Sequence, residues 1–209
     1  MKGRGGPAMA GESVQTVRAG GTVPHSAVAL VGFMAAGKSA VGRELATALG
    51  LPFADTDDLV VEGAGPISLI FAERGEAGFR ALESRVVTEA LQEAAGRPCV
   101  LALGGGAVLS DAVRDALGSL LHVVWLTAPP EELWARAAAS GAASRPLAAD
   151  ETSFRALLAA REPLYRQVAT TIVDTGGRTP AAVAAGLAVA LASRNAGEPA
   201  RTSGGGGTA

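Results

Sequence analysis

This 209-residue chain has little cysteine, few aromatic residues and no long apolar run. Its one cysteine, Cys99, cannot form an internal disulfide. Because it lies in an apolar run with no histidine close by, it is predicted to be a small core residue and not a catalytic thiol. The longest apolar stretch, 180–192, is too short to span a bilayer. No continuous apolar segment follows Lys2 and Arg4, so we expect no secretory signal and a cytoplasmic location.

Strong net charge is also missing. The formal charge is −2, which provides no basic footprint for nucleic acid or for an anionic membrane. Hydrophobic residues make up 48% of the chain and aromatic residues only 4%, so the core is expected to consist of Ala, Val and Leu. We expect one domain at 25–194, because residues 1–24 and 195–209 are rich in Gly and small residues and predict disordered tails.

Lysine is scarce as well: of 18 basic residues only Lys2 and Lys38 are lysines. Lys38 stands in GFMAAGKS (32–39), which matches the phosphate-binding pattern G-x-x-x-x-G-K-[ST] between a predicted strand and a predicted helix. A compact ammonium fits between phosphate oxygens where a planar guanidinium does not. Backbone N–H groups of this loop are expected to hold phosphates, with Lys38 on the outer phosphates and the Ser39 hydroxyl on Mg²⁺. The pattern predicts a nucleoside triphosphate as ligand.

Strand and helix patterns alternate along the rest of the domain. Strands are predicted at 27–31, 52–54, 99–103, 122–126 and 170–173, and helices at 38–49, 67–94, 111–117, 131–139, 153–168 and 180–193, with an interruption near 74–78. This alternation is typical of an α/β fold with a parallel sheet covered by helices on both faces. Ligands bind such sheets at the carboxyl ends of the strands, where Gly32, Asp55 and Gly104 fall.

Two further strand ends carry residues suited to chemistry. Asp55 and Asp57 follow the second strand, and on an extended segment their side chains point different ways, so that one can face a metal and the other a substrate. Gly104, Gly105 and Gly106 follow the third strand and allow backbone to approach a ligand closely. A solvated turn remains the alternative for the aspartates, and a simple turn for the glycines.

The arginines are harder to interpret one at a time. Arg145 lies in a segment rich in small residues, 140–152, which suits a lid that brings positive charge onto a phosphate, with Arg136 upstream. Arg80 is compatible with a surface ion pair to a nearby glutamate, and Arg161 and Arg166 with a solvated helix face. The sequence pattern alone leaves these alternatives open.

Taken together, the motifs resemble those of the shikimate kinases. The resemblance extends over about 28–192 and rests on six segments in order: GFMAAGKS (32–39), FADTD (53–57), GEAGFRALE (75–83), LGGGAV (103–108), RPL (145–147) and REPLYRQVA (161–169). The first segment is general to phosphate-binding loops, whereas the other five together are specific.

The resemblance implies a five-stranded parallel sheet in the order 2-3-1-4-5 and ATP-dependent phosphorylation of the 3-hydroxyl of shikimate in aromatic amino-acid biosynthesis. Asp57 would hold the substrate hydroxyls and accept the reacting proton. The substrate-binding set would be Asp57, Arg80, Gly105, Gly106 and Arg166, the two arginines clamping the carboxylate. Ser39 and Asp55 would hold Mg²⁺. The ATP-binding set would be Ala35, Ala36, Gly37, Lys38, Ser39, Ala40, Arg136 and Arg145, with Arg136 the weaker candidate against adenine. Lys38, Asp57 and Arg145 would be catalytic, and the protein a monomer.

Two features depart from the family pattern. The segment GPISLIF (65–71) is one residue shorter than the usual form, so the substrate-binding helix is expected to start differently. Ala35 stands where the phosphate loop of the family usually has a further glycine, so a methyl group there is unfavourable if the position requires a positive φ.

Three other functions are alternatives to this one. A kinase for another small hydroxylated acid, such as gluconate, would keep Lys38 and Ser39 but would not need both Arg80 and Arg166. A GTPase-like switch is excluded because its Asn-Lys-x-Asp motif cannot be present when the only asparagine is Asn195. A non-catalytic ATP-binding homologue would not need the full set of charged residues.

Overall fold

The computed structural model describes residues 26–140 and 150–196. The strands are β1 Val28–Val31, β2 Phe53–Asp55, β3 Val100–Ala102, β4 His122–Thr127 and β5 Thr171–Asp174. The helices are α1 Lys38–Leu49, α2 Thr56–Ala64, α3 Ile67–Ala94, α4 Asp111–Gly118, α5 Pro130–Ala139, α6 Glu151–Val168 and α7 Pro180–Ala196, and η1 Ala107–Leu109 is a short 3₁₀ turn.

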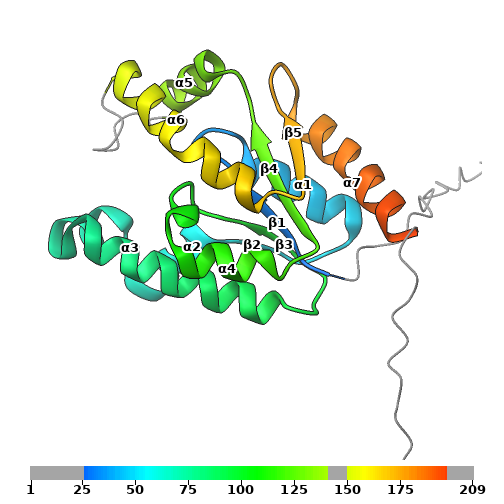
Figure 1. Ribbon diagram of the computed structural model, residues 1–209, viewed down its shortest axis with the longest axis horizontal. Coiled ribbons are helices and arrows are strands. Elements are labelled where there is room, and N and C mark those ends of the chain that lie inside the picture. The colour runs from blue at the N-terminus through cyan, green and yellow to red at the C-terminus, as the bar shows by residue number, and fades with distance from the viewer. Residues whose placement is uncertain (1–25, 141–149, 197–209) are drawn as a thin grey trace, which may run out of the picture.

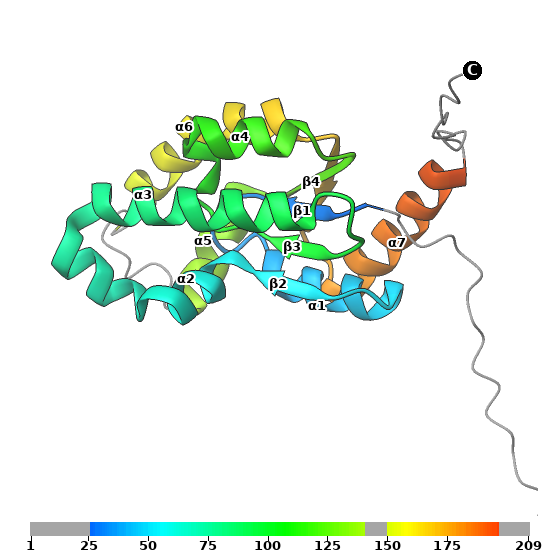
Figure 2. The same cartoon turned by 90° about the horizontal axis from the view of Figure 1, so that it is seen from below.

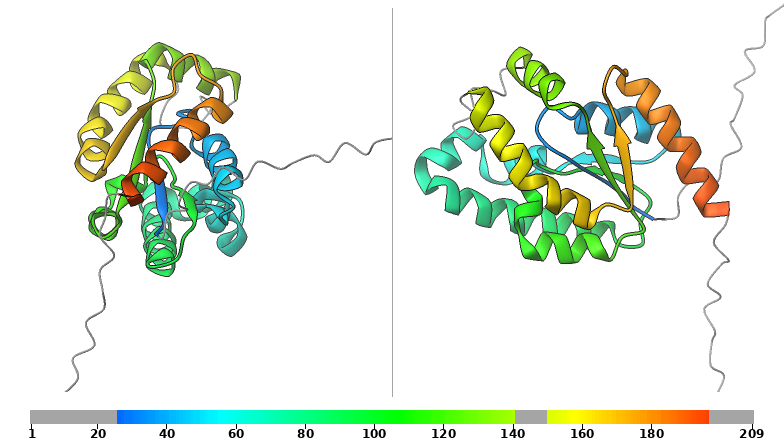
Figure 3. Two further views of the ribbon diagram at one scale, coloured as in Figure 1. Left: turned by 90° about the vertical axis from the view of Figure 1, so that its right-hand side faces the viewer. Right: turned by 45° about the horizontal axis from the view of Figure 1, so that its top comes forward.

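The five strands form one parallel sheet in the order β2-β3-β1-β4-β5, as predicted (Figure 1). In register, Ala29 of β1 lies opposite Leu101 of β3 on one side and Val123 of β4 on the other. Strands β1 and β3 are apolar throughout and fully buried, as expected for a parallel sheet with both faces covered. β5 is an edge strand beside α7 (Figure 3).

Helices cover both faces of the sheet. Helices α1 and α7 pack on each other over one face, and α3, α4 and α6 lie over the opposite face (Figure 2). The main core lies between these layers and is built mostly from Ala, Val and Leu with few aromatic side chains, as the composition predicts. Cys99 packs half-buried against this core.

Helix α2 was not predicted, and the sequence-based picture of Asp57 on an extended segment is wrong. β2 ends at Asp55, whose side chain accepts a hydrogen bond from the Asp57 backbone N–H at 3.0 Å. Asp55 therefore caps α2, and Asp57 and Asp58 occupy the first turn, where carboxylates favour the positive end of the helix dipole. An aspartate followed by acidic residues in the next turn is a pattern typical of a helix start, and the sequence contains it at 55–58.

The long helix α3 is interrupted at Gly75, within the predicted interruption at 74–78. Gly75 has φ 65° and ψ −176°, which is not helical. A second hydrophobic cluster, separate from the main core, is buried near this kink and consists of Val60, Ile70, Phe79 and Leu82. The segment formed by α2 and α3 thus has a small core of its own.

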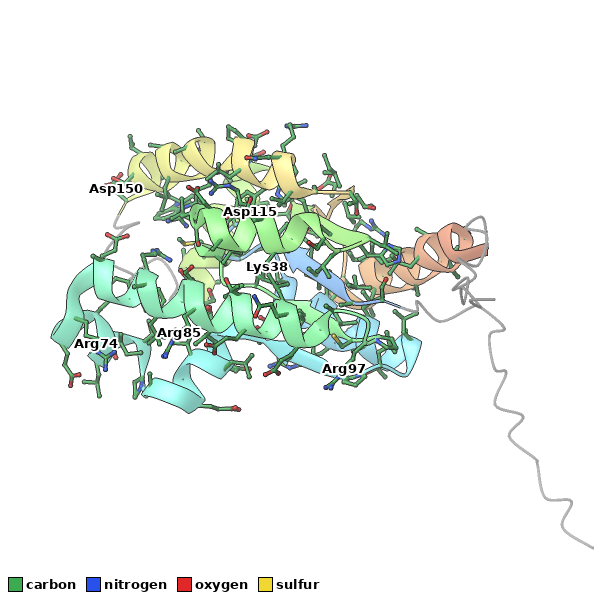
Figure 4. All side chains as sticks on the ribbon, turned by 60° about the horizontal axis from the view of Figure 1, so that its bottom comes forward. Lys38, Arg74, Arg85, Arg97, Asp115 and Asp150 are labelled. Atoms are coloured by element: carbon green, nitrogen blue, oxygen red, sulfur yellow. The ribbon has the colours of Figure 1, made fainter. Side chains whose placement is uncertain are left out.

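Several boundaries differ from the predicted ones. Helix α6 begins at Glu151, two residues early, because Asp150 caps it by accepting the Ser153 N–H at 2.8 Å (Figure 4). Helix α7 runs to Ala196 and so includes the first residues of the predicted tail 195–209. The predicted tail 1–24, the rest of the C-terminal tail and lid residues 141–149 lie outside the described residues. Within the described part of the chain, no helix has the length and apolarity that a bilayer crossing requires.

Candidate active site

The phosphate-binding loop follows β1 and leads directly into α1. Gly32 has φ 147°, and a side chain there would overlap the carbonyl oxygen of Leu126. Gly37 has φ 91° and immediately precedes Lys38, the first residue of α1. The Lys38 ammonium folds over the loop and donates to the carbonyls of Gly32 and Phe33, both at 2.9 Å. The loop thus places a lysine charge at the positive end of a helix, an arrangement that binds anions.

Ser39 and Asp55 meet beside this loop, although they come from different elements. The Ser39 hydroxyl donates to Oδ2 of Asp55 at 2.5 Å. One hydroxyl and one carboxylate fit Mg²⁺, which is usually shared between one or two protein oxygens, water and substrate phosphates. Among residues 26–140 and 150–196 no group of three or more His, Cys, Asp or Glu side chains could hold a metal ion, and Mg²⁺ bound on a nucleotide does not need one.

Two carboxylates converge on Gly104 at the end of β3. A Cβ on Gly104 would lie 2.5 Å from Oδ1 of Asp57 and 2.8 Å from Oε1 of Glu83. A larger residue at Gly104 would push these two carboxylates aside. The backbone N–H of Gly104 donates to the buried hydroxyl of Thr56 at 2.9 Å, which ties the start of α2 to this strand end. Asp57 is thereby held beside the glycine segment 104–106.

Glu83 is buried and paired with Arg80, three residues earlier on α3: its Oε2 accepts from Nη1 of Arg80 at 2.6 Å. Burial raises the pKa of Glu83, the Arg80 charge lowers it again in part, and the nearby Asp57 charge raises it. The net direction is upward from the usual value. Glu83 was not predicted from the sequence as a site residue.

Arg80 lies directly on the glycine segment. A Cβ on Gly106 would overlap Nη1 of the Arg80 guanidinium. The Nε of Arg80 is buried without a hydrogen-bond partner among the described residues, although Oε1 of Glu76 lies 3.6 Å away. By contrast, Arg74 and Arg85 of the same helix are exposed (Figure 4). Arg80 is therefore held in place at the site and is not a solvated surface residue.

Arg161 reaches the same segment from α6. It is only 4% exposed, donates to the Gly105 carbonyl at 3.3 Å, and lies over the Phe33 ring at 5.6 Å. Burial lowers the pKa of Arg161, and the neighbouring positive charge of Arg80 lowers it further. Its Nε has no hydrogen-bond partner among the described residues. Two guanidinium groups this close, in a largely buried place, form a site for an anion.

Arg166, the residue predicted for this role, does not reach the site. Its side chain is 60% exposed, pairs with Glu162 at 2.9 Å and lies over the Trp125 ring at 5.2 Å. The helical period explains the difference: Phe154, Arg161 and Tyr165 share the buried face of α6, whereas Arg166 is turned away. The helical spacing of buried residues along 153–168 therefore distinguishes Arg161, on the buried face, from Arg166, on the exposed face.

The phosphate loop also borders a pocket, separate from the glycine segment 104–106. Its lining residues are Ala35, Ala36, Gly37, Val41, Arg136, Thr175, Arg178, Pro180 and Val183. Arg136, predicted as the weaker candidate, is brought to this pocket and donates to the Thr175 carbonyl at 2.8 Å and to Glu132 at 2.6 Å. The buried Thr175 was not predicted, nor were Arg178 and Pro180. Ala40 is exposed on the first turn of α1, and Arg145 lies outside the described residues.

The fold and the site together define a phosphotransferase of the P-loop kinase class, with one pocket beside the phosphate loop and an anion site across from it. The family model described as shikimate kinase matches residues 34–192. The chain belongs to the shikimate kinase family.

Individual relatives agree with this assignment. The shikimate kinase of Symbiobacterium thermophilum is 47% identical over 156 residues, which cover 73% of this chain and 88% of that protein. The shikimate kinase of Ruegeria pomeroyi is 40% identical over 187 residues, covering 87% of this chain and 93% of that protein. A shikimate kinase structure from Acinetobacter baumannii in complex with shikimate aligns with a TM-score of 0.75 and 35% identity, over 82% of this chain and 96% of that one.

Proposed function

We propose that the protein transfers the γ-phosphoryl group of ATP to the 3-hydroxyl of shikimate, giving shikimate 3-phosphate and ADP. The observation that carries this proposal is the convergence of Arg80 and Arg161 on Gly105 and Gly106, beside Asp57. A small hydroxylated carboxylate needs this combination: guanidinium groups for its carboxylate and an acid for its hydroxyls. Gluconate, the alternative acceptor, is also a hydroxylated carboxylate, so the acceptor must be tested directly.

The acceptor is held by residues from three helices and by the glycine segment that follows β3. Arg80 and Arg161 bind the carboxylate, and Arg161 replaces Arg166 in this role because Arg166 is exposed and paired elsewhere. Asp57 accepts hydrogen bonds from the ring hydroxyls and takes the proton of the hydroxyl that attacks ATP. Gly105 and Gly106 bring backbone close to the substrate.

The nucleotide is held by the loop and by the pocket beside it. Backbone N–H groups of the loop and the Lys38 ammonium bind the phosphates, and the adenosine part lies against Arg136. Ser39 and Asp55 hold Mg²⁺, which neutralises charge on the phosphates. Arg145 is proposed to bring a further positive charge onto the transferred group.

We propose in addition that the protein works as a cytoplasmic monomer, with ATP and shikimate as its only substrates and without nucleic acid or a membrane as partner. The charge of −2 supports the absence of nucleic-acid and membrane partners.

The test is ADP release from MgATP with shikimate, with gluconate and without acceptor. We expect turnover with shikimate alone, and a strong loss of that turnover in Arg80→Ala. Arg85→Ala, on the exposed face of the same helix, is the matched control and should retain wild-type activity. Turnover with gluconate in place of shikimate would contradict the proposed acceptor, and ATP binding without turnover would contradict catalysis.

A further inference from the structure

We infer that Tyr165 is a positioning residue for the acceptor carboxylate, acting through the hydrogen bond from its hydroxyl to the carbonyl oxygen of Gly105. The inference rests on the proposed function, because it concerns how Arg161 and the glycine segment are held ready for the acceptor. Tyr165 itself need not touch the substrate.

The phenol of Tyr165 is held at both ends. Its side chain is fully buried, with 0% exposure, and its ring stacks on Trp125 of β4 with centroids 6.0 Å apart and planes at 25°. Its hydroxyl donates to the Gly105 carbonyl at 2.6 Å, a short hydrogen bond. Burial raises the pKa of Tyr165, so the hydroxyl keeps its proton and acts as a donor. The hydrogen bond gives the donated proton its direction, and the ring contact contributes packing.

The same carbonyl is a partner of Arg161. Nη1 of Arg161 donates to the Gly105 oxygen at 3.3 Å, which is longer than the bond from Tyr165. Arg161 and Tyr165 are four residues apart on α6 and so lie on one face. With the carbonyl already bound by the tyrosine, the guanidinium makes only a long bond to it and also interacts with the Tyr165 hydroxyl itself, while its Nε has no partner among the described residues. Without the tyrosine hydroxyl, Arg161 would be the carbonyl's remaining donor from α6 and would be drawn towards it.

The bond also orients the peptide that lies under Arg80. The Gly105 carbonyl and the Gly106 N–H belong to one planar peptide unit and point in opposite directions, so fixing the oxygen fixes the N–H. On the other side, Gly105 lies against the phosphate loop: a Cβ on Gly105 would be 3.3 Å from the Met34 nitrogen. The peptide is therefore held between the loop and the Tyr165 hydroxyl.

The test is the variant Tyr165→Phe, which keeps the ring on Trp125 and removes only the hydroxyl. We expect the KM for shikimate, and its dissociation constant by calorimetry, to rise about 5- to 30-fold, as the loss of a buried hydrogen bond predicts. The KM for ATP should stay within about twofold, because the loop keeps its own contacts. Trp125→Phe is the control: it weakens the ring packing and keeps the hydroxyl, so it should lower Tm and leave the KM for shikimate unchanged.

The outcomes separate the inference from the proposed function. A lower Tm in Tyr165→Phe with an unchanged KM for shikimate would overturn the inference, because the hydroxyl would then contribute to stability and not to acceptor binding. An equal rise in both KM values would overturn it too, since the effect would then not concern the acceptor. A wild-type protein that binds and phosphorylates no shikimate would overturn the proposed function and this inference together.

Discussion

The guanidinium of Arg80 occupies the space above Gly106 that any larger residue would need for its Cβ. We therefore expect Gly106→Ala to displace Arg80 and to raise the KM for shikimate about tenfold or more, a loss of at least about 1.4 kcal/mol. Gly118→Ala is the control, because no atom lies within 4 Å of a Cβ built at Gly118. Steady-state kinetics of both variants check the prediction, and an unchanged KM in Gly106→Ala would show that Arg80 is not needed where it lies.

The two arginines of α6 should differ sharply. Arg161→Ala removes a buried charge from the anion site and should raise the KM for shikimate by about 100-fold. Arg166→Ala removes only an exposed pair with Glu162 and a contact with Trp125, and should change the KM by less than about fivefold. Measuring both KM values under one set of conditions decides between the residues. The reverse ranking would restore Arg166 to the clamp.

Removal of the Ser39 hydroxyl should affect the metal. Ser39→Ala is expected to raise the Mg²⁺ concentration needed for half-maximal activity by about 10- to 100-fold, because Asp55 then loses its partner in holding the ion. Chelation with EDTA should abolish turnover in the wild type. Thr47→Ala, in the same helix, removes a hydroxyl that donates to the Arg43 carbonyl and should leave the Mg²⁺ dependence as it was. A normal Mg²⁺ dependence of Ser39→Ala would place the metal elsewhere.

Ala35 is the one described residue other than glycine with a positive φ, at 61°. A side chain in this left-handed region costs about 1–2 kcal/mol, and the greater flexibility of unfolded glycine offsets part of that. Ala35→Gly should therefore raise the free energy of unfolding by about 0.5–1 kcal/mol in urea. Ala36→Gly, at a neighbouring buried position with ordinary φ, should lower it. A loss of stability in Ala35→Gly would mean that the methyl group makes a favourable contact.

Glu83 should make stability depend on pH. Because its pKa is raised in the folded protein above the usual 4.5, the folded state binds this proton more tightly than the unfolded state. Its favourable contribution is complete below pH 4.5 and is lost as the pH rises through the folded pKa. The free energy of unfolding of Glu83→Gln, relative to wild type, should accordingly increase between pH 5 and pH 8. Urea unfolding at both pH values measures this difference, and a decrease would show that the Arg80 pair outweighs burial.

The sequence was most informative where a function depends on consecutive residues. The phosphate loop needs its glycines, Lys38 and Ser39 within one short segment, so spacing alone predicts it. The kink at Gly75 and the parallel sheet followed from local patterns in the same way. Ala35 has a positive φ, the conformation in which its methyl group is unfavourable.

Contacts between distant segments could not be predicted in this way. Thr175 bonds to the Ala36 carbonyl across 139 positions, and nothing in either segment points to the other. Arg161 and Arg166 of α6 differ for another reason: the motif contains both, and only the helical period separates the buried Arg161 from the exposed Arg166. Asp57 lies close to the end of β2, as predicted, but it belongs to the first turn of α2 and not to an extended segment, because Asp55 caps this helix.

The separate hydrophobic cluster around Phe79 has a consequence for how such an enzyme can evolve. Phe79 packs in this cluster while its neighbour Arg80 faces the glycine segment, so acceptor-binding residues are supported by a core that the phosphate loop does not share. Substitutions around Arg80 and Asp57 are therefore expected to be accommodated by α2 and α3, with the sheet and its loop left intact. One nucleotide-binding framework can in this way be inherited unchanged while the molecule it phosphorylates diverges.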